Sequence, residues 1–537
     1  MITSDSLVRK LTPQLNPEGY SSLVAAFDAA VAAFGDAPAY TSLGHTLSFS
    51  DIDVLSARLA HYLQHDAGLE PGERIAIQLP NLCQYPIAAW AAWRAGLVLV
   101  NTNPLYTKTE LIHQFNDAGA RALIVLADLM PMVAQVLPET KIEKVIVTNA
   151  TDLLKPGEVD KCGVDCVAWA EVFVDGAAAT VTTPDLQMSD VAVLQYTGGT
   201  TGVAKGAVLS HGNLFCAVRQ GRSAFKEQDA ARGERQEVFI SPMPLYHIYG
   251  FALNIVSGFL HGAHSVLIPN PRDIDSLVQV MKQHEFTGFA GVNTLFTALL
   301  QHPGFDSIDF SYLDSTIAGG AALAVEIAEQ WQQRTNSEIF EGYGLTESCA
   351  TSTVNRPESN EIGTVGQPVA FVECKLIDEE GNQVPDDQEG ELCLRGPHIM
   401  QGYWQRPEAT AEVFDDEGWF RTGDVATVTP GGHVKIVDRI KDMILVSGFN
   451  VYPNEIENVV YSYPGVHECA AIGVKNDKTG EAVKLFVACT DSDTTEKDII
   501  EHCREHLTAY KVPKQIEFRD ELPKSNVGKI LRRALRT

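Results

Sequence analysis

The sequence lacks both a long unbroken apolar run and the pattern of a secretory leader. No stretch reaches the roughly 18 consecutive apolar residues of a membrane span, and the N-terminal segment MITSDSLVRKLTPQLNPEGY has no apolar core. The strongest candidate, residues 88–100, is short and contains Arg94, so it predicts a buried helix followed by a strand. We therefore expect a cytoplasmic protein.

Basic residues and clustered cysteines are also scarce. The 41 Lys and Arg residues against 69 Asp and Glu give a net charge of −28, which argues against binding nucleic acid over a whole face. Ten cysteines are scattered through the chain, and only Cys162 and Cys166 lie close together. Without a second Cys/His pair nearby, a zinc site is not expected, and reduced thiols are the default. The length of 537 residues, at roughly 150 per domain, predicts three to four structural units.

Apolar segments alternate with helical periodicity over most of the chain. Residues 74–79, 122–126, 144–148 and 191–196 are rich in Val, Ile and Leu and predict buried strands, with helices between them over 87–95 and 110–118. Further strands are expected at 265–269 and 315–319, around a helix at 274–284. This alternation predicts an α/β fold with parallel sheets covered on both faces.

The pattern changes after about residue 365. Segments 372–378, 391–396 and 433–438 are separated by Gly-containing turns and predict an antiparallel β unit. From about residue 442 a small α+β domain is expected, with strands at 469–474 and 484–489 and a helix at 497–507. The run Asp438-Arg-Ile-Lys-Asp442 marks the predicted domain boundary.

A glycine- and threonine-rich segment, Tyr196-Thr-Gly-Gly-Thr-Thr-Gly-Val-Ala-Lys205-Gly206, follows one predicted strand. Glycine lets backbone N–H groups converge on an anion, threonine hydroxyls add donors, and lysine adds positive charge. The spacing differs from the common nucleotide P-loop, because no Gly-Lys-Ser/Thr follows. The alternative is a flexible surface loop. The composition favours a phosphate cradle made by Thr197, Gly198, Gly199, Thr200, Thr201, Gly202 and Lys205.

The segment Glu341-Gly-Tyr-Gly-Leu-Thr-Glu347 combines an aromatic face with polar groups. Tyr343 between two glycines suits stacking of a flat base. Thr346 is a hydroxyl donor, and Glu347 is a hard oxygen ligand for Mg²⁺. Taken alone, a turn with an inward tyrosine is equally compatible with these residues.

Two further segments carry charges suited to a nucleotide. Asp424, in Gly418-Trp-Phe-Arg-Thr-Gly-Asp424, and Arg439 offer an acceptor and a donor for ribose hydroxyls. Lys529 follows a glycine in the segment Pro523-Lys-Ser-Asn-Val-Gly-Lys529. Alone, the first is compatible with a hairpin bearing a solvated Asp, and the second with plain surface charge.

Six motifs in order resemble the adenylate-forming superfamily, closest to its bacterial long-chain fatty-acid–CoA ligase group. They are YTGGTTGVAKGAVLSHGNL (196–214), PLYHIYG (244–250), GVNTLF (291–296), GYGLTE (342–347), GWFRTGD through VYPNEIE (418–457) and LPKSNVGKILRR (522–533). The resemblance covers essentially the whole chain. It implies a large N-terminal AMP-binding domain (1–438) of parallel α/β sheets plus a distorted β-barrel (about 365–438), a hinge (439–442) and a small mobile C-terminal α+β domain (443–537).

The resemblance also implies a reaction in two steps. A carboxylate attacks the α-phosphorus of MgATP to give acyl-AMP and pyrophosphate, and the thiol of CoA then releases AMP. It assigns the 197–205 loop to the β- and γ-phosphates, Tyr343 to the adenine face, Thr346 to the α-phosphate, and Lys529 to the carboxylate and phosphate. Asp424 and Arg439 are assigned to the ribose, Glu347 and Thr201 to Mg²⁺, and the Gly319-Gly320-Ala321 loop to the adenine. Other implied cofactor-binding residues are Glu341, Gly342, Gly344, Ile436, Lys441 and Gly448, the last in a pantetheine tunnel.

The acyl pocket is expected beside Tyr246 and His247. The acid is already ionised at neutral pH, so His247 is interpreted as a gate or an orienting donor, with a structural histidine as the alternative. Residues 246–256 contain no acidic residue, which disfavours an amino-acid substrate. The lining is predicted from 248–259 and 288–299, where Ala290, Gly291 and Thr294 are small.

The sequence leaves several alternatives for the substrate, the acceptor and the activity. They are a medium-chain or aryl acid, an acceptor other than CoA, a luciferase-type activity, and a non-catalytic binder of acyl-AMP or acyl-CoA. A binder has no need of Lys529, and nucleic-acid binding is disfavoured by the charge. The basic run from Lys529 to Arg536 leaves open a peripheral contact with the inner face of the membrane, although a solvated helix end is favoured. A homodimer is also left open.

Overall fold

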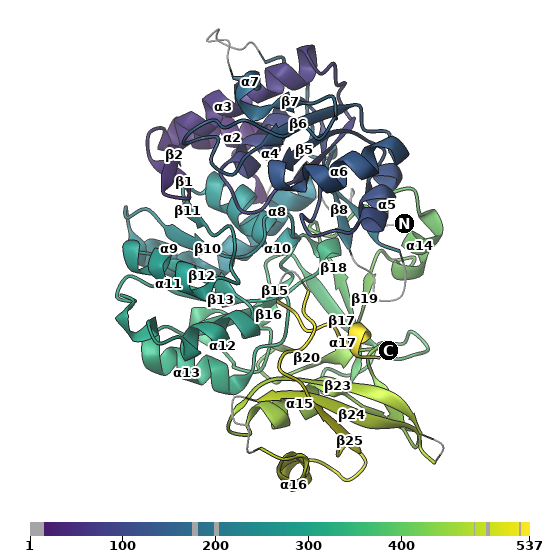
Figure 1. Ribbon diagram of the computed structural model, residues 1–537. Coiled ribbons are helices and arrows are strands. Elements are labelled where there is room, and N and C mark those ends of the chain that lie inside the picture. The colour runs from purple at the N-terminus through teal and green to yellow at the C-terminus, as the bar shows by residue number, and fades with distance from the viewer. Residues whose placement is uncertain are drawn as a thin grey trace.

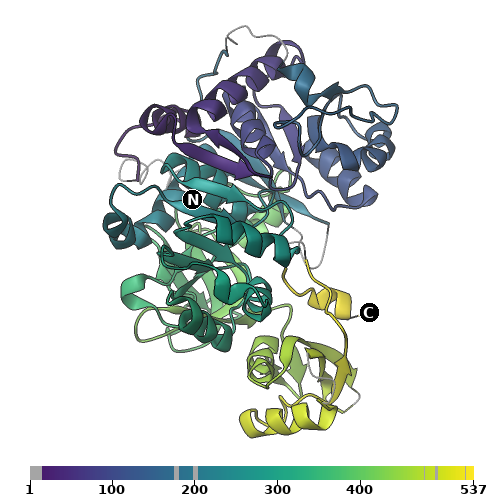
Figure 2. The ribbon, with the colours of Figure 1, turned by 60° about the vertical axis from the view of Figure 1, so that its left-hand side comes forward.

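Two large sheets with helices packed against them form the N-terminal part of the molecule, and a smaller C-terminal unit lies at one end of it (Figures 1 and 2). The computed structural model describes residues 15–173, 181–197, 203–476, 478–489, 494–525 and 528–536. Within these residues no helix is long and apolar enough to cross a membrane.

The first sheet has nine strands, and its central strands are parallel. Their order is β16 (Gln367–Pro368), β15 (Thr353–Val354), β14 (Ile339–Tyr343), β13 (Ser315–Ala318), β12 (Gly288–Gly291), β10 (Val238–Ser241), β11 (His264–Leu267), β1 (Pro38–Ser42) and β2 (His45–Ser48). β2, β15 and β16 pair antiparallel at the two edges.

The second sheet has seven strands and is parallel except for one edge. Its order is β7 (Val167–Ala168), β6 (Lys144–Thr148), β5 (Ala120–Leu126), β3 (Arg74–Gln78), β4 (Val98–Asn101), β8 (Val191–Thr197) and β9 (Lys205–Ser210). The strands predicted at 74–79, 122–126, 144–148 and 191–196 are therefore confirmed, and the phosphate-cradle segment connects β8 to the antiparallel β9.

Helices cover both sheets, and one of these helices is almost completely buried. α4 (Gln84–Arg94) is buried over ten consecutive residues, as its apolar sequence on every face requires. Its Trp90 lies 4.6 Å, between ring centroids, from Phe27. The remaining helices of this part are α2 (Leu23–Phe34), α3 (Phe49–His65), α5 (Lys108–Ala118), α6 (Met130–Val136), α7 (Trp169–Val172), α8 (His211–Arg222), α9 (Lys226–Arg232), α10 (Ile248–Gly250), the π-helix η4 (Phe251–Gly258), α11 (Ile274–Gln283), α12 (Asn293–Gln301), α13 (Val325–Thr335) and α14 (Pro407–Val413).

The predicted β unit is a four-stranded antiparallel sheet. It consists of β17 (Glu373–Ile377), β18 (Gly390–Arg395), β19 (Phe420–Val428) and β20 (Val434–Arg439), in that order. These strands occupy the place that the resemblance gives to the distorted barrel. In the described residues the sheet is an open path of neighbouring strands.

The C-terminal unit has a sheet and a hydrophobic core of its own. Its elements are β21 (Ile444–Val446), β22 (Phe449–Val451), α15 (Pro453–Tyr461), β23 (Val466–Asn476), β24 (Gly480–Cys489), α16 (Glu496–His506), β25 (Gln515–Phe518) and α17 (Arg532–Leu535). β20 ends at Arg439 and β21 begins at Ile444, so the predicted hinge, 439–442, comprises the last residue of β20 and three residues of the turn that follows. Tyr452 donates a hydrogen bond of 2.7 Å to Glu389 across this boundary.

Candidate active site

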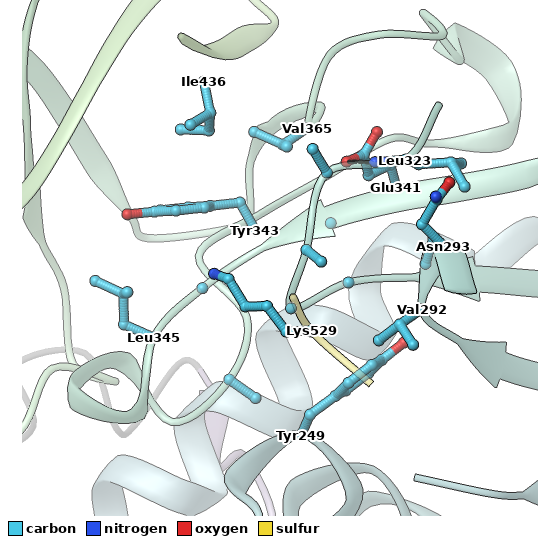
Figure 3. A pocket seen from close by; sticks show the side chains of 18 of the residues that line it. Tyr249, Val292, Asn293, Leu323, Glu341, Tyr343, Leu345, Val365, Ile436 and Lys529 are labelled. Carbon is cyan, nitrogen blue, oxygen red and sulfur yellow. Dashed lines mark hydrogen bonds between the residues drawn. The ribbon is translucent and has the colours of Figure 1, made fainter. Parts of the chain in front are cut away.

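A cavity of about 1410 Å³ lies between the N-terminal part and the C-terminal unit. Gly319, directly after β13, and Tyr343, at the end of β14, line it at the carboxyl ends of neighbouring strands. This is where open α/β sheets bind their ligands. Figure 3 shows the side chains that surround the space.

The cavity brings together most of the residues predicted from separate motifs. Those that line it are Thr197, His247, Gly319, Gly320, Ala321, Glu341, Gly342, Tyr343, Gly344, Thr346, Glu347, Asp424, Ile436, Arg439, Lys441 and Lys529. Gly198, Gly199, Thr200, Thr201 and Gly202 lie outside the described residues. Lys205 and Gly448 do not line the cavity in this arrangement of the two parts.

Tyr343, Asp424 and Arg439 form one connected group. Antiparallel pairing of β19 and β20 places Asp424 opposite Arg439, and Arg439 Nε lies 3.3 Å from Asp424 Oδ1. The hydroxyl of Tyr343 donates a 2.6 Å hydrogen bond to Asp424 Oδ2. The bond holds the hydroxyl end of the Tyr343 side chain in place, and Ile436 lies above the ring in Figure 3. A buried carboxylate, an arginine and a flat apolar face therefore lie side by side.

Glu341 is a buried carboxyl group in the cavity wall. Its Oε1 accepts a hydrogen bond of 3.1 Å from Leu323 N, and burial raises its pKa to about 8. At neutral pH the side chain is therefore largely protonated and offers both a donor and an acceptor to a ligand. The neighbouring Gly344 has no room for a side chain, because a Cβ there would overlap the carbonyl of Ala350.

Glu347 lies in a short 3₁₀ turn, Thr346–Ser348, that follows β14. Its Oε1 accepts a 2.7 Å hydrogen bond from the hydroxyl of Tyr403, and burial raises the pKa of the carboxyl group. Lys205 lies over the ring of Tyr403, with Nζ 5.0 Å from the centroid. Lys205 is thus linked to Glu347 through Tyr403, a residue that sequence reasoning missed. The sequence gives little indication of this contact, because 56 residues separate Tyr403 from Glu347.

Lys529 enters the cavity from the C-terminal unit on a small hairpin. An isolated bridge joins Lys524 to Ile530, and Gly528 takes the turn with a φ of +79°. The hairpin is held against the N-terminal part by Thr294, whose hydroxyl donates a 3.0 Å bond to the carbonyl of Gly528. Burial, together with the positive charge of Arg439, lowers the pKa of Lys529 to about 7.

Arg532, three residues after Lys529, anchors this hairpin. Its guanidinium lies 2.6 Å from Glu457 and 3.2 Å from Asp438. Asp438 in turn accepts a 2.8 Å hydrogen bond from the backbone of Asn454. The sequence predicts a solvated helix end for the basic C-terminal run. Arg533 and Arg536 are exposed, whereas Arg532 is largely buried by these ion pairs.

Two family models match the chain. The AMP-binding enzyme model covers residues 27–404, and the AMP-binding enzyme C-terminal domain model covers residues 455–529. The chain belongs to the AMP-binding enzyme family.

Relatives of this AMP-binding enzyme match over nearly full length. A long-chain-fatty-acid–CoA ligase from Escherichia coli O6:H1 (strain CFT073) is 44% identical, covering 97% of this chain and 95% of the relative. A ligase of the same name from Bacillus subtilis (strain 168) is 34% identical, covering 94% and 92%. The structure of the anthranilate CoA ligase AuaEII in complex with anthranoyl-AMP has a TM-score of 0.87 at 25% identity, covering 96% of each chain.

His247 of this AMP-binding enzyme caps the short helix α10. Its Nδ1 accepts a 3.3 Å hydrogen bond from the backbone N–H of Tyr249. Burial and the charge of Lys529 lower its pKa to about 4, so the ring is neutral at pH 7. It is therefore a neutral polar group of the cavity wall with one nitrogen engaged in the cap.

Of the two stretches predicted to line the acyl pocket, 248–259 contributes more residues to the cavity wall than 288–299 does. From 248–259, Ile248, Tyr249 and five residues of η4 line the cavity: Ala252, Leu253, Asn254, Ser257 and Gly258. From 288–299, the lining is limited to Val292, Asn293 and Thr294. Ala290 and Gly291 do not line it. Ala290 is part of a hydrophobic core, and a Cβ at Gly291 would meet the ring of Phe296.

Replacing Tyr403 by phenylalanine is expected to lower the affinity for Mg²⁺, whose predicted ligand is Glu347, and to leave folding intact. Glu347 loses the hydrogen bond that favours its charged form, so its pKa rises further and fewer carboxylates are ionised at neutral pH. Loss of such a partner to a metal ligand typically costs about 10- to 100-fold in metal affinity or activity. The measurement is the Mg²⁺ titration of the rate of pyrophosphate release.

The matched control for Tyr403→Phe is Tyr40→Phe. It removes a buried tyrosine hydroxyl bonded to the carbonyl of Asn254 and does not touch Glu347. Its Mg²⁺ dependence should match the unmodified enzyme. An unchanged Mg²⁺ dependence in Tyr403→Phe contradicts the positioning role of Tyr403.

Proposed function

We propose that the protein is an AMP-forming fatty-acid–CoA ligase that acts on long chains. The observation that carries this proposal is the meeting of Lys529, from the C-terminal unit, with Tyr343, Asp424 and Glu347 in one cavity. The membership in the AMP-binding enzyme family and the names of its relatives support the choice of an acid and CoA as substrates.

In the first step an oxygen of the fatty carboxylate bonds to the α-phosphorus of ATP, and the bond to pyrophosphate breaks. Both reactants are anionic, so positioning and charge stabilisation dominate. Tyr343 and Ile436 hold the adenine, Asp424 and Arg439 the ribose, and Thr346 the α-phosphate. Lys529 donates to both anions. Lys205 and Thr197 border the segment that holds the outer phosphates.

Glu347 fits a Mg²⁺ ligand, because its carboxylate is buried in the cavity wall beside the hydroxyl of Tyr403. A Mg²⁺ ion held by Glu347 would supply positive charge to the phosphates. Thr201 is proposed as a second contact.

In the second step the CoA sulfur bonds to the acyl carbonyl carbon, and AMP leaves. We propose that the C-terminal unit rotates about the turn 440–443 between the steps, which withdraws Lys529. Gly448, in the hairpin between β21 and β22, would then approach the cavity. Its φ of +83° is a conformation that glycine adopts without strain.

The acid is proposed to be a fatty acid because the cavity continues along an aliphatic and aromatic surface. Val218, Phe225, Phe239, Leu253 and Ile317 line this continuation. In this stretch no lining residue offers an unpaired carboxylate for a substrate ammonium group, as far as the described residues extend.

The test is a product assay with purified protein, MgATP, CoA and saturated fatty acids from short to long. AMP, ADP and acyl-CoA are scored separately. We expect AMP and acyl-CoA in equal amounts, with turnover rising toward long chains. ADP as product overturns the adenylate route. Pyrophosphate release without acyl-CoA means a different acceptor, and benzoate-type acids turned over in place of fatty acids mean an aryl-acid ligase.

A further inference from the structure

The cavity extends along one face of the nine-stranded sheet, away from the nucleotide-binding end. Ser315 and Ile317 of β13 and Gly319 directly after it line the cavity, with Ala318 added at the carboxyl end, and so do Phe239 of β10 and Glu237 directly before it. Side chains two residues apart lie on the same face of a strand. At about 3.3 Å per residue, the wall from Gly319 to Ser315 is about 13 Å long.

The opposite wall of this channel is formed by helices. The π-helix η4 contributes Leu253 and Ser257, and α8 contributes Val218 and Gly221. Small residues Gly258 and Ala263 lie near the amino ends of the strands. The channel is therefore lined mainly by apolar and small side chains in its middle part.

Charged side chains stand at the amino end of the channel. Arg222, Asp229, Arg232 and Glu237 all line the cavity. Arg222 lies 2.7 Å from Asp229 and 2.5 Å from Glu237, and Arg232 lies 3.2 Å from Asp229 and 3.4 Å from Glu237. These four residues, here called the ion-pair ring, form a closed cycle of alternating charges.

The ion-pair ring carries no net charge and is partly buried, with the side chains of Arg222 and Asp229 23% and 29% exposed. Two arginines face two carboxylates, and the side chains of Arg232 and Glu237 are 5% and 10% exposed. Arg232 is held further by Asp314, at 3.0 Å, just before β13. An alkyl tail can enter this region only by separating buried charge pairs, which is strongly unfavourable.

Next to the ring, Gln228 offers an acceptor. It lines the cavity, its Oε1 is buried, and among the described residues none donates a hydrogen bond to that atom. A buried acceptor without a donor is costly. A hydroxyl at the end of a substrate chain would satisfy it, and a methyl group would not.

We propose that the ion-pair ring ends the acyl channel and sets the upper limit of chain length, and that this end accepts an ω-hydroxyl group in place of a terminal methyl group. The inference rests on the proposed function. It makes Arg222 and Glu237 specificity-determining residues and adds ω-hydroxy fatty acids to the substrate class.

The first experiment compares kcat/KM along a series of saturated acids for the unmodified enzyme and for Arg222→Met/Glu237→Met. Each methylene that finds an apolar wall should raise kcat/KM roughly fourfold. The rise should stop at one chain length in the unmodified enzyme. In the double variant, which opens the ring by removing Arg222 and Glu237 and leaves Arg232 paired with Asp229 and Asp314, it should continue for further carbons.

The matched control is Arg121→Met/Glu73→Met, which removes an ion pair of 2.8 Å from outside the cavity lining. In this control variant the rise in kcat/KM should stop at the same chain length as in the unmodified enzyme. An unchanged stopping point in the folded Arg222→Met/Glu237→Met variant overturns the role of the ring and leaves the ligase function intact. Absence of acyl-CoA from the unmodified enzyme over the whole series overturns both proposals.

The second experiment needs no variant and so does not depend on folding of a double mutant. It measures the ratio of kcat/KM for each ω-hydroxy acid to that for its unsubstituted parent. Short chains place the hydroxyl in the apolar part, so the ratio should lie below one by tenfold or more, as for an unpaired buried hydroxyl. It should rise above one at the length where the first series stops. A ratio independent of length overturns the proposed polar end.

Discussion

Replacing Lys529 by alanine is expected to slow acyl-adenylate formation by roughly 10²–10³. A lysine about 4 Å from an anion, at an effective dielectric constant of about 20, interacts by about 4 kcal/mol. Only the part that differs between ground and transition states affects the rate, at 1.36 kcal/mol per tenfold. The measurement is the single-turnover rate of pyrophosphate release.

The second step separates this role from a structural one. Thioester formation from supplied acyl-AMP should be much less affected, because the proposed rotation withdraws Lys529 before that step. Lys524→Ala is the matched control, since Lys524 lies in the same hairpin, pairs with Glu468 and does not line the cavity. Equal loss of both steps in Lys529→Ala, or loss of neither, contradicts the assignment.

The pH profile of adenylation is a second test of the role of Lys529. The pKa of Lys529 is lowered to about 7, so its charged form is present below that pH and is lost as the pH rises through it. Because kcat/KM reports the free enzyme, it should fall above pH 7 by up to about tenfold per pH unit. Bound ATP favours the charged form, so kcat alone should hold to higher pH. The Lys529→Ala variant should lack this alkaline fall.

Much of the fold could be predicted because its signals are local. Runs of Val, Ile and Leu marked β3, β5, β6 and β8, and helical periodicity marked α4 and α5 within a few residues of their ends. The π-helix η4 was not predicted as such, because an extra residue per turn leaves the same apolar composition.

The candidate site could be assembled only as far as its motifs extend. Tyr343, Asp424 and Lys529 each lie in a segment with its own composition, so each could be named as a candidate, and all three line the cavity. Tyr403, Thr294 and Arg532 act through contacts with residues 56, 234 and 94 positions away, namely Glu347, Gly528 and Asp438. Spacing along the chain carries no trace of such contacts. The ion-pair ring was not predicted for the same reason, since isolated Arg and Glu residues in a sequence indicate only solvated charge.

Replacing Lys441 by proline is expected to impair one half-reaction at least about tenfold more than the other, a difference of 1.36 kcal/mol or more in activation free energy. Lys441 lies in the turn between β20 and β21, where the backbone of Asp442 donates a 3.0 Å hydrogen bond to the carbonyl of Arg439. Proline fixes φ at this residue and restricts the conformation of Ile440. The two conformations that the proposed rotation requires of this turn are thereby reduced to one.

Because Lys441 also lines the cavity, the backbone effect must be separated from loss of the side chain. Lys441→Ala provides that control, since it removes the amino group and leaves the backbone free. Pyrophosphate release reports the first step, and acyl-CoA formation from supplied acyl-AMP reports the second. If the hinge is at this turn, the two rates change unequally in the proline variant and are closer together in the alanine variant. Equal loss of both steps in Lys441→Pro, beyond that in Lys441→Ala, counts against rotation about this turn and places the pivot elsewhere.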